Sequence, residues 1–426
     1  MIGTTTLAAL PGRLRIGASN RLAGKLVAGL LGSVLAGCGG PSADPQPARE
    51  MAVGAVEGSA QPHLDLDEHG TAILSWLEPG GDGYALRMST GAGDSWSPPR
   101  TVATGDDWFV NWADFPSVTP IGGDALAAHW LVYQPQGFAY DAVLSLSADG
   151  GASWGDSKLL HIDGTDTEHG FVTLFPWQDG VAAVWLDGRN MIVDGEFAFE
   201  NAAGEPLGMS LQYALFDDAG ERLAAEQLDP LACDCCQTDV AMSGDDALLV
   251  YRDRTAAEVR DIIVRRLTGD GWQPPIPLAP DNWVLDACPI NGPAIAARDD
   301  QVAVAWFSAA HGRPVVRVVR SNDGGRTFGD AMDVDSSGSF GHVDIAALPN
   351  GETAVSWLRS EADGLALVLR LIDRAGGFGE PIAVAEVGTA APLDFPQMVF
   401  DGTRLVFAWT DFGETQRVRS AVVRIY

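Results

Sequence analysis

A short apolar segment that ends in an aromatic residue recurs seven times, and this repeat constrains the fold more than any other feature. Each segment is four to six residues long, is built from small apolar side chains and follows turn residues, which is typical of a buried strand. The aromatic ends are Trp76, Trp130, Trp185, Tyr251, Trp306, Trp357 and Trp409. They lie 54, 55, 66, 55, 51 and 52 residues apart. A repeat of about 50 residues with several short strands indicates one β-sheet unit per period.

Each period has room for four strands, one before the apolar segment and two after it. The pattern therefore predicts an all-β protein, a seven-bladed β-propeller of four-stranded antiparallel blades, over residues 59–426. The last period stops one strand short. We expect the segment Met51–Gly58 to supply the missing outer strand and close the ring.

A second signal occurs in the turns between the third and fourth strands. "SADGGASW" (Ser147–Trp154) and "SNDGGRTF" (Ser321–Phe328) share the pattern Ser-x-Asp-Gly-Gly-x-Ser/Thr-aromatic. In such a turn the carboxylate accepts backbone N–H bonds, the glycines supply positive φ, and the aromatic ring packs beneath. Weaker copies occur at the same phase in "STGAGDSW", "LTGDGW" and "IDRAGGF".

These turns resemble the Asp box, or BNR repeat, of the sialidase-like propeller superfamily. That resemblance implies a propeller, with six blades as the alternative to seven, and a sialidase-like glycoside hydrolase of the exo-sialidase type as the activity. Sialidases of this superfamily clamp a carboxylate with three arginines and use a tyrosine nucleophile, a glutamate and an acid/base aspartate. This chain has no Arg-Ile-Pro motif, and no tyrosine precedes an inner strand. Whether it is an enzyme therefore stays open.

The N-terminus has the features of an export signal. Four basic residues precede the apolar run "LVAGLLGSVLAG", which is too short to span a bilayer. The run ends in Leu-Ala-Gly-Cys38, which resembles the bacterial lipobox, and Gly39 then implies the outer membrane. We expect a signal peptide at 1–37, lipidation at Cys38, and a flexible tether at 38–58. The protein would be anchored in the cell envelope by its lipid alone, on the periplasmic or the surface face.

Composition restricts the partners. The chain has 57 acidic and 27 basic residues, with a formal net charge of -30. Such a surface repels nucleic acid and anionic lipid. We expect no nucleic-acid partner, and instead a glycan or a protein of the cell envelope.

Cysteine is rare but concentrated. Three of the five cysteines, Cys233, Cys235 and Cys236, lie in "LACDCCQTDVA", and Cys288 lies in "DACPINGPAIA". Cys236 and Cys288 are one period apart, so they occupy equivalent loops of blades four and five and should converge. An exported chain favours disulfides. Thiolates with His169 or His342 would instead suit copper or zinc. One bridge with two free thiols is a third alternative, and no cofactor is certain.

The loops that enter the first strand and leave the second lie on one face, where propeller ligands usually bind. Glycoside hydrolysis would need two facing carboxylates, and the candidates are Asp114, Asp239, Asp344 and Asp394. The candidate ligand-binding residues are Arg189, Arg252, Arg254, Arg260, His169, His342 and Asn291. Arginines grouped there would bind a carboxylate or sulfate, or form ion pairs between blades.

Two further features bear on this face. The 66-residue interval holds an insertion, Asn190–Gly208, with Phe197 and Phe199 among acids; it is a lid over a ligand or a surface loop. We expect a ligand- or partner-binding site at the cysteine-lined channel mouth. A remodelled glycoside hydrolase and a copper- or zinc-binding protein are the alternatives.

Overall fold

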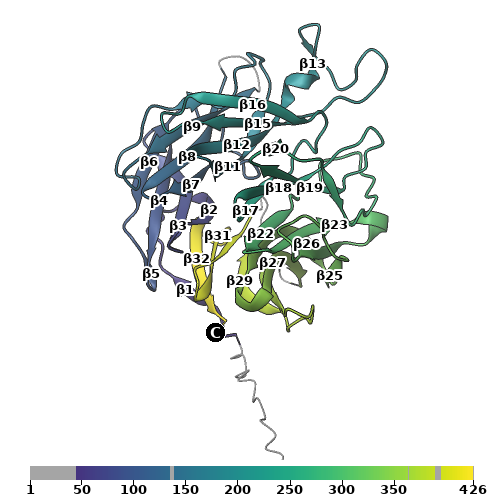
Figure 1. The fold of residues 1–426 in the computed structure, drawn as a ribbon. Coiled ribbons are helices and arrows are strands. Elements are labelled where there is room, and N and C mark those ends of the chain that lie inside the picture. Colours follow the sequence, from purple (N-terminus) through teal and green to yellow (C-terminus); the bar gives the residue numbers. More distant parts are fainter. Residues whose placement is uncertain (1–44, 135–138, 363, 389–394, 426) are drawn as a thin grey trace, which may run out of the picture. The chain divides into compact units, whose positions relative to one another are not determined.

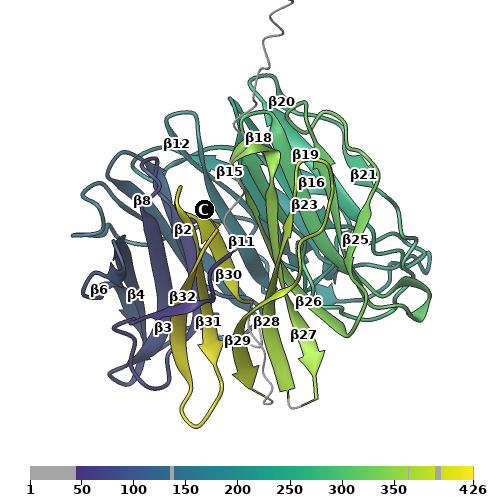
Figure 2. The same cartoon turned by 90° about the horizontal axis from the view of Figure 1, so that it is seen from below.

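A computed structural model of the chain describes residues 45–134, 139–362, 364–388 and 395–425. The predicted signal peptide, Cys38, the start of the tether and Asp394 lie outside these residues. The described part folds into seven four-stranded antiparallel blades, so the chain is an all-β propeller and the fold prediction is confirmed. The blades are arranged around a central axis (Figures 1 and 2).

Each blade runs from an inner strand near the axis to an outer strand at the rim. The inner strands are β2 (Ala60–Leu66), β7 (Ser117–Gly122), β11 (His169–Trp177), β17 (Asp239–Ser243), β22 (Ala294–Arg298), β26 (Ser339–Ala347) and β30 (Gln397–Phe400). The second strands are β3 (Ala72–Gly80), β8 (Ala125–Tyr133), β12 (Gly180–Asp187), β18 (Asp246–Arg252), β23 (Gln301–Ser308), β27 (Thr353–Glu361) and β31 (Arg404–Asp411).

The outer halves of the blades are more varied. The third strands are β4 (Gly83–Ala92), β9 (Tyr140–Ser147), β15 (Ser210–Phe216), β19 (Ile262–Thr268), β24 (Val315–Ser321), β28 (Gly364–Ile372) and β32 (Arg417–Arg424). The fourth strands are β6 (Arg100–Gly105), β10 (Lys158–Leu159), β16 (Arg222–Asp229), β21 (Ile276–Leu278), β25 (Met332–Asp335), β29 (Ile382–Gly388) and β1 (Arg49–Met51).

Short additional elements complete the described chain. They are the strands β5 (Ser95–Trp96) and β20 (Gly271–Trp272), the hairpin β13 (Ile192–Val193) and β14 (Glu196–Phe197), and the 3-10 helices η1 (Gly188–Met191), η2 (Ala310–Gly312) and η3 (Pro349–Gly351). No helix in the described residues is long and apolar enough to cross a membrane.

The repeated aromatics explain how the blades pack. Trp76, Trp185, Trp306 and Trp357 are at most 1% exposed, and they end the apolar segments of second strands that lie between two other strands. A buried indole N–H needs an acceptor. Four of them donate to carboxylates at 2.8–3.0 Å, those of Glu78, Asp187, Asp281 and Asp335.

The ring is closed by the two ends of the described chain. Strand β1 pairs antiparallel with β32, with Glu50 opposite Ala421 and Met51 opposite Ser420. In Figure 1 the purple N-terminal strand lies beside the yellow C-terminal strands. Closure by an N-terminal strand agrees with the expectation, but the strand is Arg49–Met51 and not Met51–Gly58. The propeller therefore includes residues before the expected start at residue 59.

The Asp-box turns have the expected internal bonding. In the first, Asp149 accepts hydrogen bonds from the Ser153 backbone N–H at 2.8 Å and from the Ser153 hydroxyl at 2.6 Å. The second turn repeats both bonds between Asp323 and Thr327. The glycines have φ values from 67° to 78°. These turns join third to fourth strands and therefore lie on the face opposite the cysteines.

Candidate functional site

The cysteine-bearing loops lie on the face where inner strands begin. Cys233, Cys235 and Cys236 precede β17 of blade four, and Cys288 precedes β22 of blade five. The Sγ atoms of the first three all lie within 4.8 Å of one another. Those of Cys233 and Cys236 are 3.1 Å apart, and the Cys288 thiol contacts that of Cys235. The structure thus brings all four together, as the one-period spacing predicted.

All four thiols are free in the structure, since no pair is at bonding distance. Their exposure differs: Cys233 and Cys236 are each 1% exposed, Cys235 is half-buried and Cys288 is exposed. Contacts with the thiols of Cys235 and Cys236 lower the pKa of Cys233 well below its usual value, and the guanidiniums of Arg252 and Arg260 add to this. Burial raises the pKa of Cys236.

The nearby arginines are engaged inside the protein. Arg252 is 2% exposed, and its guanidinium donates to the backbone carbonyls of Asn291, Arg260 and Phe307 at 2.7–3.1 Å. Arg254 pairs with Asp234 at 2.7 Å and with Glu258 at 2.9 Å.

Arg260 reaches the sulfur atoms directly. It pairs with Glu258 at 2.7 Å, and its Nη1 lies 3.4 Å from Cys233 Sγ. The arginines therefore support the thiol loop, and their predicted role as anion ligands stays a prediction.

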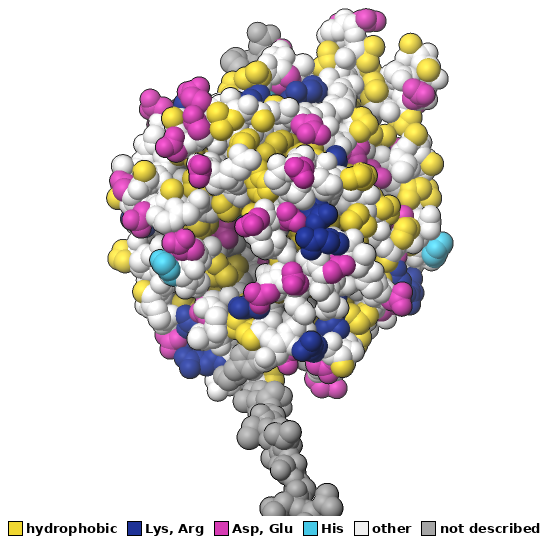
Figure 3. Space-filling view, in the orientation of Figure 1, with side chains coloured by type: hydrophobic (Ala, Val, Ile, Leu, Met, Phe, Trp, Pro, Cys, Tyr) yellow, Lys and Arg dark blue, Asp and Glu magenta, His cyan; other side chains and the backbone are white. Residues whose placement is uncertain are grey.

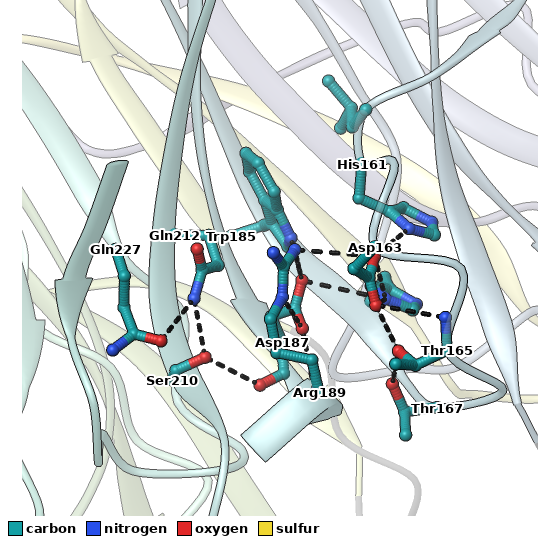
Figure 4. A network of polar contacts seen from close by, with 12 residues as sticks. His161, Asp163, Thr165, Thr167, Trp185, Asp187, Arg189, Ser210, Gln212 and Gln227 are labelled. Carbon is teal, nitrogen blue, oxygen red and sulfur yellow. Dashed lines mark hydrogen bonds and ion pairs between the residues drawn. The ribbon is translucent and has the colours of Figure 1, made fainter. Parts of the chain in front are cut away.

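A second cluster lies at the neighbouring position, in blade three and the loop before it (Figure 4). The rings of His161 and His169 stack with centroids 3.5 Å apart. Asp163 lies 2.7 Å from His161 Nδ1 and 3.2 Å from His169 Nε2. Asp141 lies 3.1 Å from the other nitrogen of His161, and the Tyr140 carbonyl lies 3.2 Å from His169 Nδ1. Three of the four imidazole nitrogens thus have a hydrogen-bond partner, whereas His161 Nε2 lies at ion-pair distance from Asp141 without hydrogen-bond geometry.

Asp187 and Arg189 complete this cluster. Asp187 is fully buried and accepts the Arg189 Nη2–H at 2.6 Å and the Trp185 indole N–H at 2.8 Å. Burial alone would lower the pKa of His161, but the carboxylates of Asp141 and Asp163 raise it above its usual value. Two sets of three ligand atoms here also lie within 4.8 Å of one another, one from Asp141, His161 and His169 and one from Asp163, His169 and Asp187. Because all of them are already paired, the thiols offer the better metal site.

The candidate carboxylates border a cavity on the axis. It has a volume of about 250 Å³ and is lined by the inner strands of all seven blades. Asp239 accepts the Ile295 N–H at 2.7 Å and Asp344 accepts the Met398 N–H at 2.5 Å, each from the next blade. Asp114 accepts the Phe171 N–H at 2.7 Å. These bonds tie neighbouring blades together.

Burial sets the protonation of these acids. It raises the pKa of Asp114 and Asp239 to about 7, and that of Asp344 well above its usual value, with Asp239 adding to the last. Burial disfavours a charged carboxylate, so these side chains bind protons more readily than solvated aspartates.

Aromatic side chains from three blades meet at the mouth of this cavity. Phe395 stacks on His342 with ring centroids 4.1 Å apart, and Trp112 lies nearly parallel to both at 6.2 Å. Asn291 is buried, and its Oδ1 accepts the His342 backbone N–H at 2.8 Å. His342 and Asn291 therefore contribute to the cap over the channel.

The insertion in blade three forms a small hairpin, β13–β14, that projects from the molecule (Figure 1). Phe197 and Phe199 are 55% and 69% exposed, and their rings meet edge to face at 5.1 Å. At the base of the hairpin, Met209 is buried and its N–H donates to Asp234 of the thiol loop at 2.8 Å. Acidic side chains are spread over the face seen in Figure 3, in line with the net charge.

Sequence reasoning selected His169 and Arg189 but missed the partners that hold them. His161 and Asp163 lie in the same loop as His169, in "HIDGTDTEHG", and this concentration of His and Asp was the available signal. Asp141 belongs to a third strand of another blade, so nothing local pointed to it.

No family model matches the chain, and no curated protein matches it in sequence. Solved structures do resemble it. The endosialidase of phage phi92 aligns with a TM-score of 0.50 and 9% identity over 89% of this chain and 69% of its own. An α-L-arabinofuranosidase of Fusarium graminearum aligns with a TM-score of 0.48 and 11% identity over 89% of this chain and 98% of its own. The intramolecular trans-sialidase of Ruminococcus gnavus aligns with a TM-score of 0.44 and 12% identity over 87% of this chain and 96% of its own. At such identity the likeness shows the fold alone, which is a β-propeller.

Proposed function

We propose that the protein is a metal-binding propeller of the cell envelope, lipid-anchored through Cys38, that holds a soft metal ion at Cys233, Cys235, Cys236 and Cys288. The observation that carries the proposal is the convergence of four thiols from two blades, with two of them buried 3.1 Å apart. Thiolates are the ligands that Cu(I) and Zn(II) prefer. One thiol also contacts an arginine, which compensates the negative charge that thiolates bring into a buried site.

The surroundings of the candidate carboxylates favour binding over hydrolysis. A glycosidase needs two carboxylates that face an open site. Asp239 and Asp344 instead accept backbone N–H bonds between blades, in a cavity with an aromatic cap. The hydrolase alternative would regain support if aryl glycosides were turned over by the wild type and not by Asp239→Asn.

The test is a competition experiment with the full-length reduced protein. The protein would be titrated with Cu(I) or Zn(II) against a coloured chelator of known affinity. We expect one tight equivalent in the wild type and a loss of at least ~100-fold in affinity in Cys233→Ser and Cys236→Ser, since soft ions bind oxygen ligands weakly. His311→Asn, which removes an exposed imidazole of blade five, is the control and should bind like the wild type.

Two outcomes would overturn the proposal. One is wild-type binding no tighter than that of a variant in which all four cysteines are serine. The other is an equal loss in His311→Asn. Retained circular dichroism of the serine variants would show that binding, and not folding, was removed.

A further inference from the structure

The four thiols differ sharply in how they meet the solvent. Cys233 and Cys236 are each 1% exposed, and their sulfur atoms contact each other. Cys288 is exposed, and its thiol contacts that of the half-buried Cys235. Exposure therefore divides the cluster into an inner pair, Cys233 and Cys236, and an accessible pair, Cys235 and Cys288, while Cys235 also contacts the inner pair. Cys235 is also close to Cys233 and Cys236, but a bridge to its neighbour Cys236 would need a distorted peptide, and a bridge to Cys233, two residues away, would be strained.

The accessible pair has the arrangement that thiol–disulfide exchange requires. Exchange begins when an accessible thiolate attacks one sulfur of an external disulfide, and it is completed by a second thiol within reach. Cys288 meets the first requirement because it is exposed on the loop before β22. Cys235 meets the second because it contacts Cys288 from a different blade. The inner pair has no such access.

We infer that Cys288 and Cys235 form a redox-active dithiol that exchanges with low-molecular-weight or protein disulfides, with Cys288 as the attacking thiol and Cys235 as the resolving thiol. The Cys288 thiolate attacks a disulfide R–S–S–R, forms a Cys288–S–S–R bond and releases one thiolate. Cys235 then loses its proton to solvent, attacks Cys288 Sγ and expels the second thiolate. Two protein thiols and one disulfide become one protein disulfide and two small thiols, so two electrons pass to the external disulfide.

This activity goes beyond metal binding and does not need a metal. It also predicts an order among the cysteines, because exposure decides which thiol an external disulfide can reach. The accessible pair should oxidise first and the inner pair later. Since Cys235 and Cys288 are also proposed metal ligands, oxidation of this pair would remove half of the thiolates available to the metal.

The experiment uses metal-free, reduced, full-length protein and oxidised glutathione as the disulfide. Samples would be quenched with acid at intervals, alkylated and mapped by mass spectrometry. In the wild type we expect a Cys235–Cys288 disulfide before any Cys233–Cys236 disulfide. In Cys235→Ser the glutathione adduct should accumulate on Cys288. In Cys288→Ser the first oxidation should slow by at least about tenfold, since the remaining thiols are less accessible.

Several results would overturn the inference. A first adduct on Cys233 or Cys236, an unchanged rate in Cys288→Ser, or a wild type that stays fully reduced would each do so. Metal affinity of the reduced protein is measured separately, so this failure is distinguishable from failure of the metal site. Mapping the wild type needs no variant, and thus the inference stays testable even if a serine variant misfolds.

Discussion

Two clusters of reactive side chains occupy neighbouring blades on the same face, and they are built on opposite principles. The cluster of blade three pairs unlike groups: Arg189 and two imidazoles face three carboxylates. The cluster of blades four and five gathers four like groups: three sulfur atoms lie within 4.8 Å of one another, the Cys288 thiol contacts that of Cys235, and one arginine contacts Cys233. The first cluster supplies partners of opposite charge from within itself, whereas the second gains a full set of partners only from a ligand or from oxidation.

This difference separates stability from binding. Buried polar groups with complementary partners hold elements together, and removing one of them leaves the others unpaired. Like groups brought together give little attraction of their own, so such an arrangement is informative about a ligand. We therefore expect the imidazole–carboxylate cluster to respond to mutation mainly in folding stability, and the thiol cluster mainly in binding.

The largest effect should come from Asp187→Ala. This change removes the buried acceptor of the Trp185 indole N–H and the nearer carboxylate partner of Arg189, whose second partner, Asp163, lies 3.5 Å away. We expect a loss of about 4 kcal/mol in the free energy of unfolding, since breaking a buried ion pair on one side is strongly destabilising. Chemical denaturation would measure it.

The matched control for this change is Asp333→Ala. That carboxylate pairs with Arg313 and Arg317 near the surface, and it should cost less than about 1 kcal/mol. Equal losses in the two variants would show that the cluster of blade three is no more important for stability than a surface ion pair.

The next effect is the stabilisation that metal confers. A ligand that binds only the folded state adds about 2.7 kcal/mol at a hundredfold excess over its dissociation constant. The wild type and Asp187→Ala should gain the same increment from Cu(I), and Cys233→Ser with Cys236→Ser should gain none. Thermal or chemical unfolding with and without metal measures this. An increment lost in Asp187→Ala but kept in the double variant would reverse the roles of the two clusters.

The sequence predicted the architecture because its signals are local and repeated. Each apolar segment with its aromatic end specifies a second strand, and the Asp-box turns confirm the phase. Strand β1 could be inferred only by counting strands, and the predicted segment, Met51–Gly58, lies just after the observed strand, Arg49–Met51. The reason is that a three-residue edge strand carries no periodic pattern of its own. The convergence of Cys236 and Cys288 followed from the same period.

The imidazole–carboxylate cluster could not be assembled in this way. Asp141 comes from the third strand of blade two and Asp187 from the second strand of blade three, and they meet around a loop whose path no period determines. The role of Arg252 was equally hidden. Its guanidinium donates to three backbone carbonyls. Every residue has a backbone carbonyl, so the sequence does not indicate which carbonyls will lie near an arginine.

A smaller effect, the pH dependence of folding stability, would test the contrast between the imidazole–carboxylate cluster and the thiol cluster. The pKa of His161 is raised by Asp141 and Asp163, while the ring of His169 stacks upon it. A raised pKa gives stability that is complete below about 6.5, the unfolded value, and is lost as pH rises through the folded pKa. Unfolding free energies from pH 5.5 to 8 should therefore fall less in His161→Asn than in the wild type.

The quantity to compare is the difference between the wild type and His161→Asn in how the free energy of unfolding changes with pH. The pKa values of Asp114 and Asp239, raised by burial to about 7, also make stability fall with rising pH, and they do so in both proteins. On the acid side the pKa values of Asp141 and Asp163 are lowered despite burial, mainly by hydrogen bonds to the histidines, so their contribution is lost as pH falls below about 4. Parallel profiles for the two proteins would contradict the pairing.

The smallest effect should come from the projecting hairpin beside both clusters. Phe197 and Phe199 are 55% and 69% exposed, so changing both to serine should alter the free energy of unfolding by no more than about 0.5 kcal/mol. Met209→Ser, at the buried base, should cost several times as much because it removes an apolar side chain from the core of blade three.

The double variant of Phe197 and Phe199 also tests whether the hairpin is a lid. If its stability is unchanged but its Cu(I) affinity or its rate of Cys288 oxidation changes severalfold, the hairpin covers the thiols as a lid. If neither changes, it is a surface loop, and the thiol cluster functions without it.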